Sequence, residues 1–178
     1  MKNSVYLGIS LDGYIADKNG GLEWLDMIPN PDGVDMGYPA FMEKIDALVM
    51  GRNTFETVIS FGVEWPYHKP VYVLSSSLQE APDELKGKVF PMNGTLKDVL
   101  AEIHEKGHTS LYIDGGKTVQ SFLKEDLIDE LILTTIPIIL GGGARLFGDL
   151  PQPLELELVS SKIILGQIVQ SHYVRKRK

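Results

Sequence analysis

The sequence of 178 residues contains no cysteine. This absence excludes disulfides, thiolate-bound zinc, cysteine-bound iron–sulfur clusters and thiol catalysis. No apolar run approaches the roughly 20 residues of a membrane-spanning helix, because the most apolar stretch, residues 131–140, includes Thr134, Thr135 and Pro137. Asp12 interrupts the first apolar segment, which therefore lacks a signal-peptide pattern. We expect a cytoplasmic protein with no membrane partner.

Basic side chains are also in short supply. Lysine and arginine number 17 against 24 aspartates and glutamates, which gives a net charge of −7. A duplex nucleic-acid binder depends on lysine and arginine to neutralise phosphates, so we exclude nucleic acid as a partner and expect a small molecule. The basic run at residues 175–178 is interpreted as the solvated end of a strand.

The length of the chain fits one domain, residues 1–178, because a chain this long buries roughly two thirds of its unfolded surface. Apolar runs alternate with helical patterns along its first two thirds. We expect strands at residues 5–10, 47–50, 71–74, 88–90 and 111–113. We expect helices at residues 38–45, from 51 onward, between Thr95 and Gly107, and around 119–123. This alternation predicts a largely parallel sheet that is covered on both faces.

The last third of the chain has a different pattern. Residues 131–140, 154–164 and 168–174 contain strand-like runs without convincing helices between them. Apolar and acidic residues alternate from residue 154, which predicts a half-exposed strand. The predicted fold class is therefore α/β, with a mixed, mostly parallel sheet of about eight strands and an antiparallel C-terminal end.

Two junctions of strand, glycine and helix have the pattern of anion sites. They are residues 51–54 (GRNT) and 115–118 (GGKT). A helix N-terminus presents unpaired N–H groups, and glycine lets an anion approach the backbone. Ser75 and Ser76 follow Leu74 at the end of another strand, and ligands of open α/β sheets lie at such carboxyl ends. One elongated dinucleotide would reach all three places.

Each junction also has a simpler interpretation, which is a tight turn for the paired glycines and a solvated side chain for Arg52. The sequence has no G-x-G-x-x-G fingerprint. It has no complete P-loop, because Leu111 stands where the first glycine of G-x-x-x-x-G-K-[ST] belongs. A nucleotide-dependent phosphotransferase built on residues 116–118 is therefore the weaker alternative.

Five motifs occur in order along nearly the whole chain: residues 9–16 (ISLDGYIA), 48–55 (LVMGRNTF), 114–116 (DGG), 127–131 (LIDEL) and 137–143 (PIILGGG). In these motifs the chain resembles the dihydrofolate-reductase-like reductases. It is most similar to the C-terminal reductase domain of the bifunctional riboflavin-biosynthesis deaminase/reductase and to its stand-alone bacterial relatives. The resemblance implies the three-layer fold of that family, NADPH as cofactor, and a homodimer formed through the antiparallel C-terminal part.

By the same resemblance, thirteen residues would hold NADPH. They are Ala16, Gly51, Arg52, Asn53, Thr54, Leu74, Ser75, Ser76, Asp114, Gly115, Gly116, Lys117 and Thr118. A cation beside hydroxyl groups suits a ribose 2′-phosphate, which favours NADPH over NADH. The loop from Ala16 to Trp24 would be a flap over the nicotinamide, and the Gly115–Gly116 peptide would be cis.

The substrate end is less well defined. Reduction of an imine or of a ring-opened sugar carbon needs a proton donor near the acceptor. Asp12, within the S-L-D-G motif, and Asp35 are the candidate catalytic acids. Trp24 and Thr134 are the candidate substrate contacts. Asp12 equally suits a turn-stabilising role, Thr134 equally suits the core, and Asp114 replaces the glutamate that usually precedes the two glycines in the riboflavin-pathway enzymes.

Residues 104–108 match the zinc motif H-E-x-x-H. Two histidines bind zinc in this motif when they lie one turn apart on a helix. Gly107 is expected to end the helix, which would leave His108 in the following turn. We therefore predict no metal site.

The sequence predicts an NADPH-dependent reductase of a pyrimidine- or pteridine-type heterocycle, similar to the 5-amino-6-(5-phosphoribosylamino)uracil reductase of riboflavin biosynthesis. Two alternatives stay open. One is dihydrofolate reductase activity, and the other is a dimer that binds NADPH without catalysis.

Overall fold

The structure is a computed structural model that describes residues 1–177. Its strands are β1 (Lys2–Ser10), β2 (Tyr14–Ala16), β3 (Ala47–Gly51), β4 (Val71–Leu74), β5 (Val89–Met92), β6 (Ser110–Asp114), β7 (Glu130–Ile136), β8 (Ala144–Arg145), β9 (Leu156–Ile164) and β10 (Ile168–Arg175). Its α-helices are α1 (Tyr38–Glu43), α2 (Arg52–Ser60), α3 (Leu96–Glu105) and α4 (Gly116–Lys124). Two short 3₁₀ helices cover Glu23–Asp26 and Asp83–Leu85.

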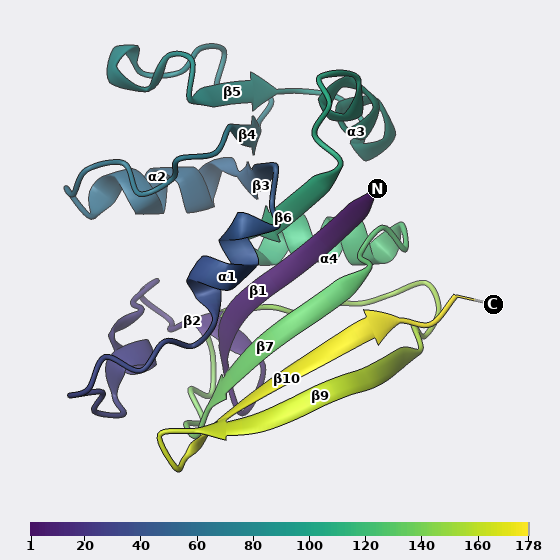
Figure 1. Ribbon diagram of the computed structural model, residues 1–178. Coiled ribbons are helices and arrows are strands. Elements are labelled where there is room, and N and C mark those ends of the chain that lie inside the picture. Colours follow the sequence, from purple (N-terminus) through teal and green to yellow (C-terminus); the bar gives the residue numbers. More distant parts are fainter. Residues whose placement is uncertain (178) are drawn as a thin grey trace.

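Eight of the strands form one mixed sheet in the order β5-β4-β3-β6-β1-β7-β10-β9 (Figure 1). Neighbours from β5 to β7 are parallel, whereas β10 is antiparallel to both β7 and β9. The predicted fold class is thus confirmed. Strands β2 and β8 form a separate antiparallel pair, which the sequence did not indicate because both are very short.

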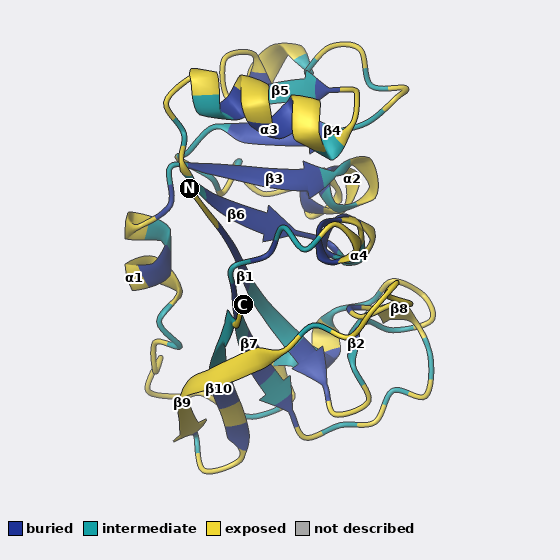
Figure 2. Ribbon diagram, turned by 90° about the vertical axis from the view of Figure 1, so that its right-hand side faces the viewer, coloured by how far each residue is buried: buried dark blue, intermediate teal, exposed yellow. Residues whose placement is uncertain are grey.

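Alternate side chains of the central strands supply two cores. In β3, Ala47 and Val49 pack with buried residues of α3 and α4, whereas Leu48 and Met50 pack with buried residues of α1 and α2. Successive side chains of a strand point to opposite faces, so α1 and α2 cover one face of the sheet and α3 and α4 cover the other. The predicted three layers are confirmed, and β3 and β6 are buried on both sides (Figure 2).

Strand β9 differs from its prediction as a half-exposed strand. Residues 156–163 are all exposed (Figure 2). The side chain of Leu158 is 55% exposed and that of Ile163 is 72% exposed. The reason is position, because β9 is the last strand of the sheet and has a neighbouring strand on one side alone.

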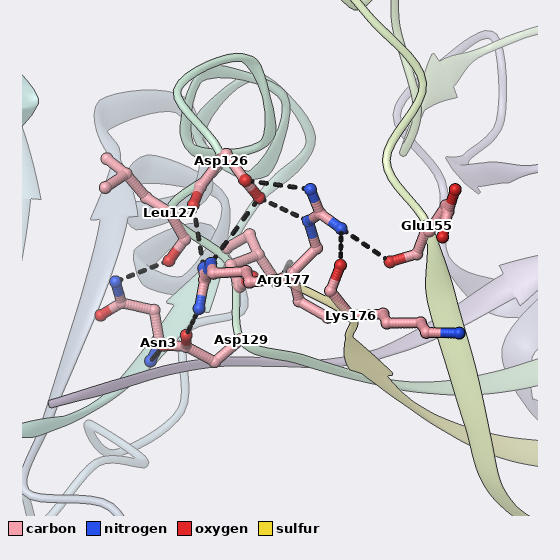
Figure 3. A network of polar contacts seen from close by, with 9 residues as sticks. Asn3, Asp126, Leu127, Asp129, Glu155, Lys176 and Arg177 are labelled. Carbon is pink, nitrogen blue, oxygen red and sulfur yellow. Dashed lines mark hydrogen bonds and ion pairs between the residues drawn. The ribbon is translucent and has the colours of Figure 1, made fainter.

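The basic C-terminal run is tied down, which corrects its interpretation as a solvated strand end (Figure 3). Arg175, whose side chain is 11% exposed, contacts Asp126 through Nε and Oδ1 at 2.6 Å. Arg177 pairs with Asp129 and donates to the Asp126 carbonyl oxygen. The arginine at 175 lowers the pKa of the Asp126 carboxyl. Lys178 lies outside the described residues.

None of the helices within residues 1–177 has the length and apolar character that crossing a membrane requires.

Candidate functional site

A cleft of about 1570 Å³ runs along the carboxyl edge of the sheet. The ends of β3, β4 and β6 reach it with Gly51, Leu74 and Asp114, and the first residues of α2 and α4 line it. Because parallel strands all point to this edge, they place residues that are far apart in sequence around one space.

All thirteen residues predicted to hold the cofactor line this cleft. They come from the strand ends, from the two helix starts and from Ala16 on β2. The structure therefore brings the predicted cofactor residues together. Their role as NADPH ligands stays a prediction.

The first junction joins β3 to α2. Arg52 begins α2, and its Nη1 donates to Ser77 Oγ at 2.6 Å. Ser75 Oγ accepts the backbone N–H groups of Ser77 and Leu78 at 3.1 and 2.9 Å, which holds the serine turn in shape. A guanidinium group and several hydroxyl groups thus share one end of the cleft.

The second junction joins β6 to α4. Gly115 has φ +89 and ψ 142, a conformation that favours glycine. A Cβ atom at Gly115 would lie 2.2 Å from Thr54 Oγ1, and one at Gly51 would lie 2.9 Å from Thr118 Oγ1. Thr54 of the first junction therefore fills the space that a side chain at Gly115 would need. In the same way, Thr118 of the second junction fills the space at Gly51. No cis peptide occurs in residues 1–177, so the cis Gly115–Gly116 bond that the resemblance implied is not found.

Asp114 is the buried acid of the cleft. Its Oδ1 accepts the Gly115 N–H at 2.7 Å, and it has no salt-bridge partner among residues 1–177. Burial raises the pKa of the Asp114 carboxyl to about 6, although the Gly115 N–H and the nearby Tyr112 hydroxyl partly offset the effect. This carboxyl group therefore changes protonation state close to neutral pH.

Asp12 serves a loop rather than the cleft. Ser10 Oγ donates to its carboxylate at 2.7 Å, and so do the N–H groups of Leu140 and Gly141 at 3.1 and 2.8 Å. Together these donors lower the pKa of the Asp12 carboxyl, with Ser10 the largest cause. The carboxylate fixes the β1–β2 turn to the glycine-rich loop at 137–143, and Asp12 is not among the cleft-lining residues.

The other three predicted substrate residues also lie outside the cleft lining. Asp35 is exposed and accepts the Gly37 N–H at 2.7 Å. Thr134 is buried, and its Oγ1 accepts from Gln170 Nε2 at 2.9 Å. Trp24 is buried in a small core with Ile136 of β7, Ile164 of β9 and Ile168 of β10. We therefore leave these three residues, and Asp12, out of the proposed site.

Several cleft residues were not predicted. The most informative are Leu25, Phe61, Tyr67 and Tyr112. Tyr112 lies between Leu111 and Ile113 in β6. This position indicates only that its side chain points to the other face of the sheet and belongs to the other core. Phe61 and Tyr67 belong to an irregular segment between α2 and β4, where the sequence has no periodic signal.

The possible zinc motif does not form a site. Helix α3 ends at Glu105, and Gly107 has φ +87. His104 lies on the helix and His108 beyond its end, as the sequence predicted. Within residues 1–177 no group of three potential ligands could hold a metal ion.

Comparisons with known proteins agree with this architecture. The family described as the RibD C-terminal domain matches residues 4–169. The uncharacterized Bacillus subtilis protein YwjB is 37% identical over 98% of both chains. A crystal structure from Shewanella sp. PV-4, provisionally described as a riboflavin biosynthesis protein, is 52% identical, covers 99% of this chain and 100% of its own, and has a TM-score of 0.97.

The dihydrofolate-reductase-like fold is confirmed by a more distant structure. Dihydrofolate reductase from Enterococcus faecalis, solved as a complex with NADP(H), superposes with a TM-score of 0.68 at 20% identity. The match covers 99% of this chain and 97% of that enzyme.

Proposed function

The chain belongs to the RibD C-terminal domain family, and on that premise we propose that it is a reductase that uses NADPH to reduce a pyrimidine- or pteridine-type heterocycle. The observation that carries the proposal is the convergence of thirteen predicted cofactor residues on one cleft. The provisional description of the Shewanella relative as a riboflavin biosynthesis protein supports a substrate of the riboflavin-pathway type.

The residues of the cleft fit a dinucleotide phosphate. The N-termini of α2 and α4 both open on it, and each presents backbone N–H groups that lack partners within the helix. Gly51 and Gly115 leave no room for a side chain at these two places. Arg52 would hold the ribose 2′-phosphate with the serine turn, and residues 115–118 would hold the pyrophosphate.

When bound, NADPH would supply the hydride, and the residues of the chain position the reactants and exclude water. Ala16, Gly20 and Leu22 bring the β2 loop to the cleft as one wall. Asp17 Oδ1 accepts the N–H groups of Asn19 and Gly21 at 2.7 and 2.8 Å, which shapes the tip of that loop. In this proposal the loop would cover the reactive end of a bound cofactor.

Cofactor titration tests the proposal. We expect nicotinamide fluorescence to saturate with NADPH at tens of micromolar or below, and NADH to bind at least tenfold more weakly. Arg52→Ala should reduce this preference severalfold, because a charge-assisted contact to phosphate is lost. Lys44→Ala, at an exposed position outside the cleft lining, is the matched control.

An absence of saturable NADPH binding would refute the proposal. Binding that requires magnesium and a nucleoside triphosphate would favour the phosphotransferase alternative. NADPH binding without oxidation in the presence of dihydrofolate or ribosylaminopyrimidines would indicate the non-catalytic dimer.

A further inference from the structure

Strand β8 is docked on α4 near the start of that helix. The backbone carbonyl oxygen of Arg145 accepts a hydrogen bond from Gln120 Nε2 of α4 at 2.8 Å. A Cβ atom at Gly116, the first residue of α4, would lie 2.8 Å from the same oxygen. The backbone of Arg145 therefore lies against the helix start that we assigned to the cofactor pyrophosphate.

The neighbours of Arg145 fix this strand through other contacts. Strand β8 pairs with β2, in which Tyr14 is the residue opposite Arg145. The Leu146 N–H donates to the Gly13 carbonyl oxygen at 3.0 Å, and the Leu146 side chain is fully buried in the core beneath α3 and α4. The backbone is thus held without the guanidinium group, which leaves the Arg145 side chain available for another role.

The guanidinium group of Arg145 has no protein counter-ion. The chain has four arginines, and the other three each form an ion pair with an aspartate or a glutamate. Arg145 forms none within residues 1–177, although acidic side chains outnumber basic ones by 24 to 17. Because Arg145 also lines the cleft, its uncompensated charge is placed where an anionic ligand can reach it.

An aromatic ring limits the orientations of this group. The guanidinium carbon of Arg145 lies over the Tyr14 ring, 5.3 Å from its centroid. The ring itself is firmly placed, since Tyr14 is only 8% exposed. A cation–π contact restrains a guanidinium group without using its N–H donors. The donors of Arg145 therefore stay free for an anion in the cleft.

Arg52 and Arg145 lie on opposite sides of the two helix starts. Strands β4, β3, β6 and β1 follow one another in the sheet. Arg52 reaches Ser77 in the turn after β4, whereas Arg145 is paired with β2, which follows β1. Helices α2 and α4, which follow β3 and β6, begin between these two positions. The cleft thus has a guanidinium group on each side of its amide-rich centre.

We propose that Arg145 is a further cofactor-binding residue, which holds the pyrophosphate of the dinucleotide from the β8 side of α4. The inference rests on the proposed function and deepens it. The ribose 2′-phosphate and the pyrophosphate are separate anions of one molecule, so Arg52 beside the serine turn and Arg145 beside α4 would each bind one of them. A guanidinium group can donate two parallel bonds to phosphate oxygens.

Two dinucleotides that differ only in the 2′-phosphate separate the roles of the two arginines. NADPH and NADH share the pyrophosphate, so Arg145→Ala should weaken both by the same factor, about tenfold. Arg52→Ala should weaken NADPH more than NADH. Nicotinamide fluorescence titration measures both affinities. Lys44→Ala, which removes one positive charge at an exposed position outside the cleft lining, is the matched control.

A conservative variant and a salt series separate binding from a structural role. Arg145→Lys keeps the charge but loses the forked donor geometry, so its NADPH affinity should lie between those of the wild type and Arg145→Ala. Salt screens such a contact, so NADPH affinity should fall less steeply with salt in Arg145→Ala. The melting temperature without cofactor should be nearly unchanged. A clear loss of melting temperature with an unchanged salt dependence would show a structural role instead.

Other outcomes would also overturn the inference. Wild-type affinity of Arg145→Ala for both dinucleotides would exclude the contact, and a loss for NADPH alone would place Arg145 at the 2′-phosphate. Weaker binding of 5-amino-6-(5-phosphoribosylamino)uracil without weaker binding of NADPH would place Arg145 at a phosphate of the acceptor. In each of these cases the wild-type protein still binds NADPH and the proposed function stands. Failure of the wild type to bind NADPH would refute both proposals.

Discussion

Gly115 is the single residue on which the cleft depends most directly. Alanine at this position would adopt a positive φ, at a cost of about 1–3 kcal/mol, and its Cβ would meet Thr54 Oγ1. We expect Gly115→Ala to lose stability in urea titration and to lose NADPH binding at least tenfold.

Gly87 provides a matched control because it also has a positive φ, +81, but open space around its Cβ position. Gly87→Ala should lose stability for the conformational reason alone and should bind NADPH normally. Normal NADPH binding by Gly115→Ala would contradict our account of the junction.

Asp12 has an architectural role that a second variant can test. Asp12→Ala removes the acceptor for the Leu140 and Gly141 N–H groups, so amide hydrogen exchange should increase within residues 137–143. Since the pKa of Asp12 lies below its ordinary value, this contact is present at neutral pH and is lost in acid, as the pH falls through the lowered pKa. Unchanged exchange in this loop would show that the contact is unimportant.

At the scale of elements, the C-terminal strand is fixed at its end by ion pairs. Arg175 reaches Asp126 from β10, and the Arg175 guanidinium also donates to the Glu155 carbonyl oxygen. Arg175→Ala should therefore lower the melting temperature more than Lys176→Ala, whose side chain is exposed. Equal melting temperatures for the two variants would rule out a stabilising role for the pair.

The accuracy of the sequence predictions also differs between elements. The central strands and the two glycine junctions were predictable, because buried apolar runs and strand-to-helix turns are local signals. The sequence did not predict that the four candidate substrate and catalytic residues lie outside the cleft lining. Thr134 bonds to Gln170, which is 36 residues away in the chain, and Tyr67 reaches the cleft from an irregular segment. Such placements depend on tertiary packing, which no local pattern encodes.

At the scale of the whole molecule, β9 leaves the sheet with a long, open apolar edge. Unpaired edge strands offer N–H and C=O groups to a second copy, and Leu156, Leu158 and Ile163 add exposed apolar surface. We expect a homodimer that forms through this edge. Light scattering should give twice the monomer mass of 19.7 kDa.

A charge placed on β9 tests this assembly. Ile163→Glu should shift the mass towards the monomer, because it buries a carboxylate in the expected interface. Val63→Glu, at a position that is 67% exposed after α2, should leave the mass unchanged. A monomeric wild-type protein would exclude the dimer.

The reciprocal fit of the two glycine junctions constrains any attempt to redesign either of them. Thr54 fills the space over Gly115, and Thr118 fills the space over Gly51. A larger side chain at Gly51 or Gly115 therefore also displaces a threonine of the other junction, so variants that tolerate one there should carry paired substitutions on both helices. The same interdependence would make these two segments co-evolve as a unit.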